Sequence, residues 1–375
     1  MTTIINNENK KLNVPNLRFP EFQGEWENFL INDVCSEFKS GKNIKADSVS
    51  ECGEYPVYGG NGLRGYTSSY NHEGSYVLIG RQGALCGNVR SVHGKTYITE
   101  HAIAVAGNEK SYTNFLHYLF LKMNLGQYSD QSAQPGLAVN KLLKLKVALP
   151  IISEQTKIAK LLSLLDERIA TQNKIIDKLQ SLIKGIVDCT ILRKEKNAII
   201  GEVCSISEQI RAEANIDDII TVRLHGNGVC KSSAENLQLG ATQYYRRRAG
   251  QLIYGKQNFH NGAIGIVPIS LDNGITSKDI PSFDIDEMKC NSVYLLAQLQ
   301  SPQYYKPAEA LTTGTGSKRL KEETFLKMPI VLPNKREQDN IAVLIHRASM
   351  NLDHAKRLLE LLSIQKQFLL RQMFI

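Results

Sequence analysis

Residues 148–159 read ALPIISEQTKIA, and residues 331–342 read VLPNKREQDNIA. At an offset of 183 positions, one register free of insertions joins 137–192 to 320–375. Identical pairs along this register include Leu137/Leu320, Leu143/Leu326, Leu149/Leu332, Pro150/Pro333, Glu154/Glu337, Gln155/Gln338, Ile158/Ile341 and Ala159/Ala342. So many aligned positions indicate an internal duplication, which sets the architecture of a chain before any local pattern does.

The composition is that of a globular protein with an excess of positive charge. Of 375 residues, 42% are apolar and 22% are charged, and 45 Lys and Arg against 37 Asp and Glu give a net charge of +8,. This excess favours a polyanionic partner. No run of eighteen apolar residues occurs and the first residues are polar, so we expect a cytoplasmic protein without a membrane segment,. Seven cysteines occur singly, which predicts reduced thiols and no metal site,.

The segments that follow the repeated Leu-Pro have the apolar spacing of long paired helices. Steps of four and three continue from Ile158 to Ile186, broken by Gln172, and recur in the second copy, where Lys366 is the exception,. The first helix is predicted from about Ser153 to about Arg193, which is about 60 Å at 1.5 Å per residue. We expect pairing through Ile158, Leu162, Leu165, Ile169, Ile176, Leu179, Ile183, Ile341, Ile345, Leu352, Leu359 and Leu362. In the alternative, each helix lies on its own domain.

The parts outside the repeat predict β-rich structure. Residues 16–136 and 196–319 are rich in Gly, Tyr, Thr and Val and contain short alternating runs such as SYVLIG (75–80) and GAIGIVPIS (262–270),. Helices are expected at 112–123 and 292–300. The predicted class is α+β, with two β-rich domains alternating with two long helices that pair as an antiparallel coiled coil of pseudo-twofold symmetry.

Several stretches carry a family resemblance that covers essentially the whole chain. LRFPEFQGEWENFLINDVCSEFKSGKN (17–43), YPVYGGNGLRGY (55–66), IGRQGALCGNV (79–89) and the two LP…EQ…IA helix starts resemble the specificity subunit of type I restriction-modification systems. The resemblance implies the following layout: target-recognition domain 1 at 1–150, a central conserved helical region at 151–194, target-recognition domain 2 at 195–333 and a C-terminal conserved helical region at 334–375.

The resemblance also implies a function and partners. Each recognition domain would read one half of a bipartite sequence in double-stranded DNA, and the helices would fix the spacer between the halves. The implied partners are two modification subunits, which are adenine methyltransferases, and a restriction subunit, which is a translocating endonuclease. S-adenosylmethionine is expected in the methyltransferase subunits and no cofactor in this chain.

The sequence lacks the motifs of an independent catalyst. A DNA adenine methyltransferase needs an [N/D]PP[Y/F] loop and a translocase needs GxxxxGK[ST], and neither occurs,. The stretch GGNGLRGYT (59–67) places Arg64 and Gly65 where the nucleotide loop requires Gly-Lys. GxSxG and HExxH are also missing,. We therefore expect no catalytic and no metal-binding residues.

Candidate DNA contacts are Lys and Arg for phosphates, and Arg, Lys, Asn or Gln for base edges, on protruding loops. In the first domain they are Asn61, Arg64, Tyr66, Arg81 and Gln82. In the second they are Tyr244, Tyr245, Arg246, Arg247, Arg248, Lys256, Gln257, Asn258, His260, Lys318 and Arg319. For each side chain, a solvated surface position is the alternative.

Two of these loops look like copies of each other. GRQGALCG and GKQNFHNGAIG align with Arg81-Gln82 on Lys256-Gln257 and with Gly83-Ala84 on Gly262-Ala263, which requires an insertion in the second copy. The segment 311–320 aligns near 131–140, and two roles stay open for it, binding phosphates or linking sheet to helix.

Two other classes of function compete with DNA recognition. One is a DNA-modifying enzyme that acts alone, which the missing motifs disfavour. The other is a coiled-coil scaffold protein whose β-rich modules bind protein or glycan ligands. A DNA reader is expected to stay on a heparin column to high salt, whereas a scaffold need not.

Overall fold

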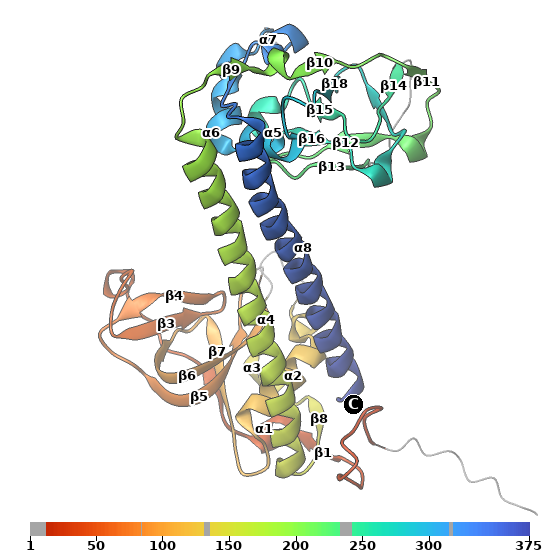
Figure 1. Cartoon of the computed structure of the whole chain (residues 1–375). Coiled ribbons are helices and arrows are strands. Elements are labelled where there is room, and N and C mark those ends of the chain that lie inside the picture. Colours follow the sequence, from red (N-terminus) through yellow and green to blue (C-terminus); the bar gives the residue numbers. More distant parts are fainter. Residues whose placement is uncertain (1–12, 84, 131–135, 233–241, 315–317) are drawn as a thin grey trace, which may run out of the picture. The chain divides into compact units, whose positions relative to one another are not determined.

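The computed structural model describes residues 13–83, 85–130, 136–232, 242–314 and 318–375, which form two compact units (Figure 1). Unit 1 holds the chain up to Gln172 together with Leu358–Ile375, and unit 2 holds Asn173–Arg357. Two long helices, α4 (Ile152–Val187) and α8 (Lys335–Gln372), each begin in one unit and end in the other. The predicted α+β class with two long helices is confirmed.

Unit 1 is built on a six-stranded sheet of order β2-β7-β5-β6-β3-β4, in which only β3 and β6 run parallel. A short ladder joins β1 to β8. The strands are β1 (Glu27–Leu30), β2 (Cys35–Ser40), β3 (Tyr55–Gly59), β4 (Gly62–Thr67), β5 (His72–Gly80), β6 (Val89–Ile98), β7 (Ala102–Gly107) and β8 (Lys146–Leu149), and the helices are α1 (Ile31–Val34), α2 (Thr113–Met123) and α3 (Val139–Leu142).

The centre of this sheet is covered on both faces, which explains the continuous apolar runs of β5 and β7. Side chains alternate across a strand. Val77 and Ile79 therefore enter one core with α2, while Leu78 enters a second cluster on the other face. The helix predicted at 112–123 is α2, and its Phe115 and Phe120 are fully buried.

Within unit 1, the first half of α4 packs beside the last turns of α8. Ile158 and Leu162 share a core with Met373 and Phe374. Farther along α4 and earlier along α8, the Lys366 ammonium lies 2.5 Å from the Asp166 carboxylate. Since later positions of one helix meet earlier positions of the other, the helices run antiparallel in this unit.

Unit 2 contains a four-stranded sheet of order β10-β18-β15-β16, a three-stranded sheet β11-β14-β17 and the pairs β12-β13 and β9-β19. Its core includes the closely packed rings of Tyr254, Phe259, Phe283 and Phe325. The strands are β9 (Ala198–Ile199), β10 (Cys204–Ile206), β11 (Arg211–Ala212), β12 (Ile220–Val222), β13 (Val229–Lys231), β14 (Tyr244–Arg246), β15 (Leu252–Tyr254), β16 (Ile264–Ile266), β17 (Ile275–Ser277), β18 (Ser282–Ile285) and β19 (Pro329–Ile330). The helices are α5 (Ser292–Leu299), which was predicted at 292–300, α6 (Pro302–Tyr305) and α7 (Glu322–Leu326).

Within unit 2, the end of α4 packs beside the start of α8. Val187 and Ile191 share a core with Ile341 and Ile345, and Lys194 pairs with Glu337. The α-helix ends at Val187 and a π-helical turn, Asp188–Leu192, extends it almost to the predicted end at Arg193.

The predicted seam positions lie on the least exposed sides of the two helices. Buried members are Ile158, Leu162, Leu165, Ile176, Ile341, Ile345 and Leu362, and half-buried members are Ile169, Leu179, Ile183, Leu352 and Leu359. Gln172, which breaks the apolar series, is also buried.

The two β-rich modules, hereafter the first module (13–150) and the second module (195–333), share a core topology. The strand order β2-β7-β5-β6 of the first equals β10-β18-β15-β16 of the second. The strand registers place Ile79 opposite Val89 and Tyr254 opposite Ile264, so both hairpins enclose nine residues, 80–88 and 255–263. The insertion predicted between these loops is therefore wrong, because Gly87 and not Gly83 corresponds to Gly262. Both Gly87 and Gly262 have positive φ, 83° and 76°.

The repeated Glu-Gln marks the joint between each module and its helix. The Gln155 side chain accepts from Tyr112 N–H (2.8 Å) and donates to the carbonyls of Lys110 and Pro150. Gln338 repeats this arrangement in unit 2 with Asn291 N–H (2.9 Å) and the carbonyls of Lys289 and Pro333. Both glutamines are fully buried, so the repeated stretch encodes the same joint twice.

All seven cysteines are free thiols. Over the described ranges no helix combines the length and the apolar composition that a membrane crossing requires. The same ranges hold no group of three or more His, Cys, Asp or Glu side chains placed to bind a metal ion.

Candidate nucleic-acid interface

In the first module, the glycine-rich hairpin of β3 and β4 lies close to the loop 80–88, which contains Arg81. Gly59 pairs with Gly62, so Gly60 and Asn61 form the turn between β3 and β4. A Cβ atom placed on Gly60 would lie 2.6 Å from the His101 carbonyl oxygen and 3.5 Å from the Arg81 nitrogen. Glycine is required at this close approach, which brings the two loops predicted from the sequence together.

Three arginines lie in this hairpin or next to it. A Cβ on Gly59 would lie 2.8 Å from Cδ of Arg64, and one on Gly62 would lie 3.1 Å from Cζ of Arg90. Arg64 and Arg90 are exposed and Arg81 is half-buried. None of the three forms an ion pair with another residue of the described ranges. The cluster therefore presents positive charge that phosphates can reach.

Among the other predicted residues of this module, Asn61 and Gln82 are exposed and Tyr66 is half-buried in β4, where it bridges Ser50. Arg90 was missed by sequence reasoning. Its place beside the hairpin depends on the return of β6 along β5, and an exposed Arg at the start of a strand carries no local signal of that contact. Ala84 and 131–135 lie outside the described residues.

In the second module, the Tyr-Tyr-Arg-Arg-Arg run divides between surface and interior. Arg246 and Arg248 are exposed, and Tyr245 is half-buried. Tyr244 is only 6% exposed, which leaves little of it for a ligand.

Arg247 is fully buried, contrary to its prediction as a DNA contact. Its guanidinium donates to Thr276 Oγ1 (2.7 Å), to Ser282 Oγ (2.9 Å) and to the Ile280 carbonyl (2.9 Å), with a longer bond to Gln209. Burial lowers the pKa of Arg247 to about 10. Arg247 directly follows β14, and its bonds join Thr276 of β17 to Ser282 of β18. This side chain therefore ties the two sheets together and does not reach a duplex.

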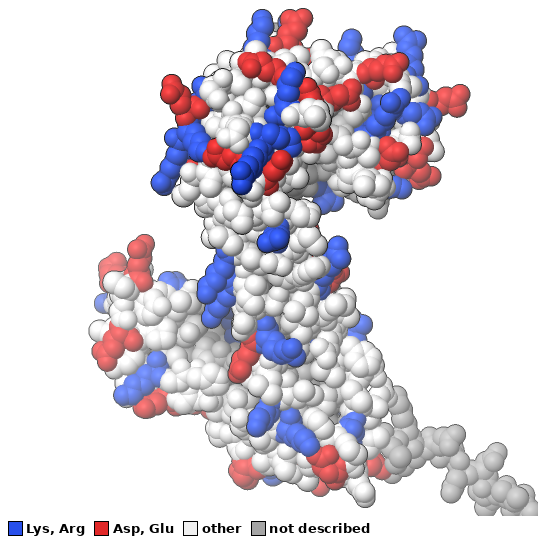
Figure 2. Space-filling model, viewed as in Figure 1, with Lys and Arg blue, Asp and Glu red and all other residues white. Residues whose placement is uncertain are grey.

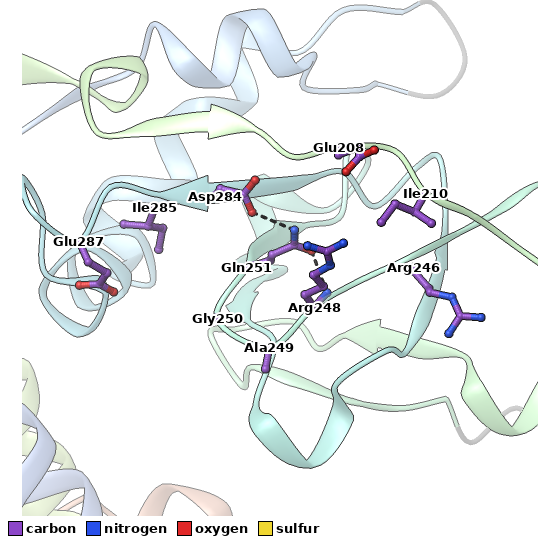
Figure 3. A pocket seen from close by; sticks show the side chains of 10 residues that line it. All are labelled: Glu208, Ile210, Arg246, Arg248, Ala249, Gly250, Gln251, Asp284, Ile285 and Glu287. Atoms are coloured by element: carbon purple, nitrogen blue, oxygen red, sulfur yellow. Dashed lines mark hydrogen bonds between the residues drawn. The ribbon is translucent and has the colours of Figure 1, made fainter.

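Arg246 and Arg248 line a pocket of about 430 Å³ together with three carboxylates (Figure 3). The Gln251 side chain links two residues of the pocket lining: it accepts from the Arg248 main-chain N–H and donates to Asp284 Oδ1, both at 2.9 Å. Glu208 and Glu287 complete the acidic lining. The mixed charge makes this pocket a weaker phosphate site than the arginine cluster of the first module.

The second predicted loop, 256–260, is close to the segment 318–320. The Leu320 N–H donates to the Lys256 carbonyl at 2.9 Å. Gln257 and Asn258 are exposed, and His260 is half-buried with no hydrogen bond to Nδ1 within the described residues. Lys318 and Arg319 are exposed. The residues 315–317 of the 311–320 segment lie outside the described ranges.

Sequence reasoning missed a second repeat that marks the start of both modules. INDVCS (31–36) and IGEVCS (200–205) share four identical residues at an offset of 169. In both copies this stretch leads from a short helical turn into the first strand of the shared sheet, β2 or β10. A search at offsets other than 183 would have found it.

Comparisons with known proteins agree with this architecture. Residues 23–181 match the type I restriction modification DNA specificity domain. The EcoprrI type I restriction enzyme specificity subunit of Escherichia coli is 41% identical over 202 residues, which cover 52% of this chain and 47% of that protein. A putative type I restriction enzyme specificity subunit of Haemophilus influenzae is 28% identical over 144 residues, 38% of this chain and 37% of the relative. The chain thus spans less than half the length of these curated relatives.

One solved structure covers nearly the whole chain. The crystal structure of a type I restriction-modification system S subunit from M. genitalium has a TM-score of 0.72 over 96% of this chain and 99% of that chain, at 14% identity. At this identity the likeness concerns the fold.

Proposed function

We propose that this chain is the DNA sequence-recognition subunit of a type I restriction-modification complex, since residues 23–181 match the type I restriction modification DNA specificity domain. The observation that carries the proposal is the repetition of one scaffold. Each module has the same four-strand order, the same nine-residue loop and the same glutamine joint to a long helix. Each loop presents Arg or Lys beside an exposed Gln, the side chains that read base edges,.

We propose that each module reads one half of a bipartite target in double-stranded DNA. The test replaces residues 16–148 by the equivalent module of a relative and maps the recognised sequence by methylation protection. The expected result is a changed first half-site with the second half-site intact. A hybrid that recognises two new half-sites would contradict the assignment of one half-site to each module.

The long helices are proposed to fix the spacer between the half-sites as an antiparallel coiled coil. Adding one heptad after Gln172 and one after Ala355 keeps the seam register and lengthens both helices by about 10 Å at 1.5 Å per residue. At about 3.4 Å per base pair, the preferred spacer should grow by roughly three base pairs. A folded variant that still selects the original spacer would show that the helices only pack.

The proposed partners are two modification subunits, which carry S-adenosylmethionine, and a restriction subunit. Exposed apolar side chains on the helices support protein docking. In unit 1, Leu361, Ile364 and Phe368 follow helical spacing on α8 and are each more than half exposed. Native mass spectrometry of the reconstituted complex should show two modification subunits per copy, and a one-to-one assembly at saturation would reject this stoichiometry.

The chain itself is proposed to be non-catalytic, so the isolated protein should neither methylate nor cleave DNA. Methyl transfer by the single chain above background would contradict this. The scaffold alternative predicts no preference between a duplex with the mapped target and a scrambled duplex, and competition binding of the full complex separates the two functions.

A further inference from the structure

The loops that begin at Arg81 and Lys256 occupy the same position on the shared scaffold. The Arg81 N–H donates to the His101 carbonyl and its own carbonyl accepts from Leu137, both at 2.9 Å. Lys256 makes the same two bonds, also at 2.9 Å, with Asp279 and Leu320. The backbone therefore equates Arg81 with Lys256 and His101 with Asp279.

This correspondence extends to the neighbouring side chains. Counting from the aligned leucines Leu137 and Leu320, Gly136 corresponds to Arg319 and Val139 to Glu322. The first module thus has neutral residues at two positions where the second module has charged ones.

The cations of the two loops differ in whether they are paired with carboxylates. In the second module, Lys256 Nζ lies 2.7 Å from Glu322 Oε1, and only 12% of the Lys256 side chain is exposed. Arg319 Nη2 lies 3.2 Å from Asp279 Oδ2. In the first module, no carboxylate of the described residues pairs with Arg81.

We propose that Asp279 and Glu322 are specificity-determining residues that restrain the second module from binding DNA regardless of sequence. The inference rests on the proposed function. A cation that is already paired releases no net counterion from the duplex when it approaches a phosphate, whereas an unpaired cation does. Asp279 and Glu322 thereby withhold the charges of Arg319 and Lys256 from phosphates.

The consequence is a division between the modules. The first module supplies the larger share of the sequence-independent affinity through Arg64, Arg81 and Arg90. The second relies more on base-edge contacts from Gln257 and Asn258, which are exposed beside the paired cations,. Figure 2 shows Lys and Arg interspersed with Asp and Glu on the visible faces of both units, so the difference between the modules lies in the individual ion pairs.

The test uses Asp279→Asn with Glu322→Gln in the full chain, assembled with its modification subunits. Binding is measured against salt concentration for a duplex carrying the mapped target and for a scrambled duplex of equal length. Two freed cations should steepen the slope of log K against log salt by up to about 1.8, at about 0.9 per neutralised phosphate. Affinity for the scrambled duplex should rise more than affinity for the target, so the ratio of the two affinities should fall.

Asp286→Asn is the matched control. Asp286 pairs with Lys289 at 3.2 Å with similar exposure, but it follows the end of β18 opposite to Asp279. This variant should keep the wild-type slope. Thermal melting confirms folding, and Asp279→Asn alone, with an expected steepening of about 0.9, replaces the double variant if that variant unfolds.

Two different failures can be told apart. If wild-type complexes prefer the target but the folded variant keeps both the wild-type slope and the wild-type affinity ratio, the restraint is refuted and DNA recognition stands. If wild-type complexes do not distinguish the two duplexes, the proposed function itself fails.

Discussion

The two modules keep the same backbone at their loops and arrange charge around it differently. In the first, glycines at 59 and 62 leave room for Arg64 and Arg90 beside the hairpin turn, and these arginines have no carboxylate partners among the described residues. In the second, Lys256 and Arg319 are held in ion pairs. The two copies have thus kept the same main-chain hydrogen bonds, while the side chains at equivalent positions differ in charge.

The largest expected effect concerns the arginine run of the second module. Arg247→Ala should lower the free energy of unfolding by about 3–4 kcal/mol, because it leaves several buried hydrogen-bond partners unsatisfied and opens a cavity. Arg246→Ala, at the exposed last position of β14, should cost no more than about 0.5 kcal/mol. Chemical denaturation of both variants measures the difference, and equal stabilities would remove the structural role of Arg247.

A second comparison tests whether the two joints are equivalent. Gln155→Ala and Gln338→Ala each remove three hydrogen bonds between a buried side chain and main-chain groups, and should each destabilise the local structure by about 2 kcal/mol,. Hydrogen exchange of peptides from α2 with β8, and from α5 with β19, reports each joint separately. Gln180→Ala, on the exposed side of α4, is the control. Faster exchange at one joint only would show that the repeat has lost its function in the other copy.

The arginines of the two modules should contribute unequally to the salt dependence of DNA binding. Replacing Arg64, Arg81 and Arg90 by Ala should flatten the slope of log K against log salt by up to about 2.7, at about 0.9 per phosphate contact. Replacing Arg246 and Arg248 should flatten it by less, because Glu208, Asp284 and Glu287 line the same pocket. Titrations of the assembled complex over a range of salt measure both slopes. A larger change for the Arg246 and Arg248 variant would reverse the assignment of electrostatic affinity to the first module.

The smallest effect is a pH dependence confined to the first module. Burial opposes ionisation of Glu37, yet hydrogen bonds from Lys39 and His72 hold its pKa below the ordinary value of 4.5. A carboxyl whose pKa is lower in the folded state stabilises that state above the ordinary pKa and loses this contribution as pH falls through the folded value. Melting temperatures below pH 4.5 should therefore fall more steeply for the wild type than for Glu37→Gln. Glu109→Gln, an exposed carboxylate of the same module, should behave as the wild type, and parallel curves for all three would contradict the prediction.

The parts of the fold that repeat with a fixed period could be read from the sequence. Heptad spacing predicted both long helices and the positions that the structure buries, since a helix places residues three and four apart on one face. The shared loop was found through Arg81-Gln82 and Lys256-Gln257. Its predicted length was wrong because the sequence alignment placed Gly262 on Gly83 instead of Gly87. Strand register, which depends on pairing between distant segments, corrected it.

The side chains of the candidate interface were predicted less well. Arg247 resembles its neighbours in sequence, and it is internal because its guanidinium bonds Thr276 and Ser282, which lie on two strands distant in the chain. Arg90 joins the arginine cluster of the first module through a contact between segments far apart in the chain. Asp279 and Glu322 pair with Arg319 and Lys256 of the second module in the same way. Residue type and local spacing contain no information on such pairings.

The glutamine joints bear on how one β-rich module could be replaced by another. Each joint is held by main-chain carbonyls and N–H groups, at Lys110, Pro150 and Tyr112 in the first copy. Because the main chain is common to all sequences, a module with different surface residues can be joined to the same helix without new contacts having to evolve. We therefore expect the repeated stretch at 148–159 and 331–342 to be a favourable crossover point for genetic recombination, since an exchange there would transfer a complete module in one event.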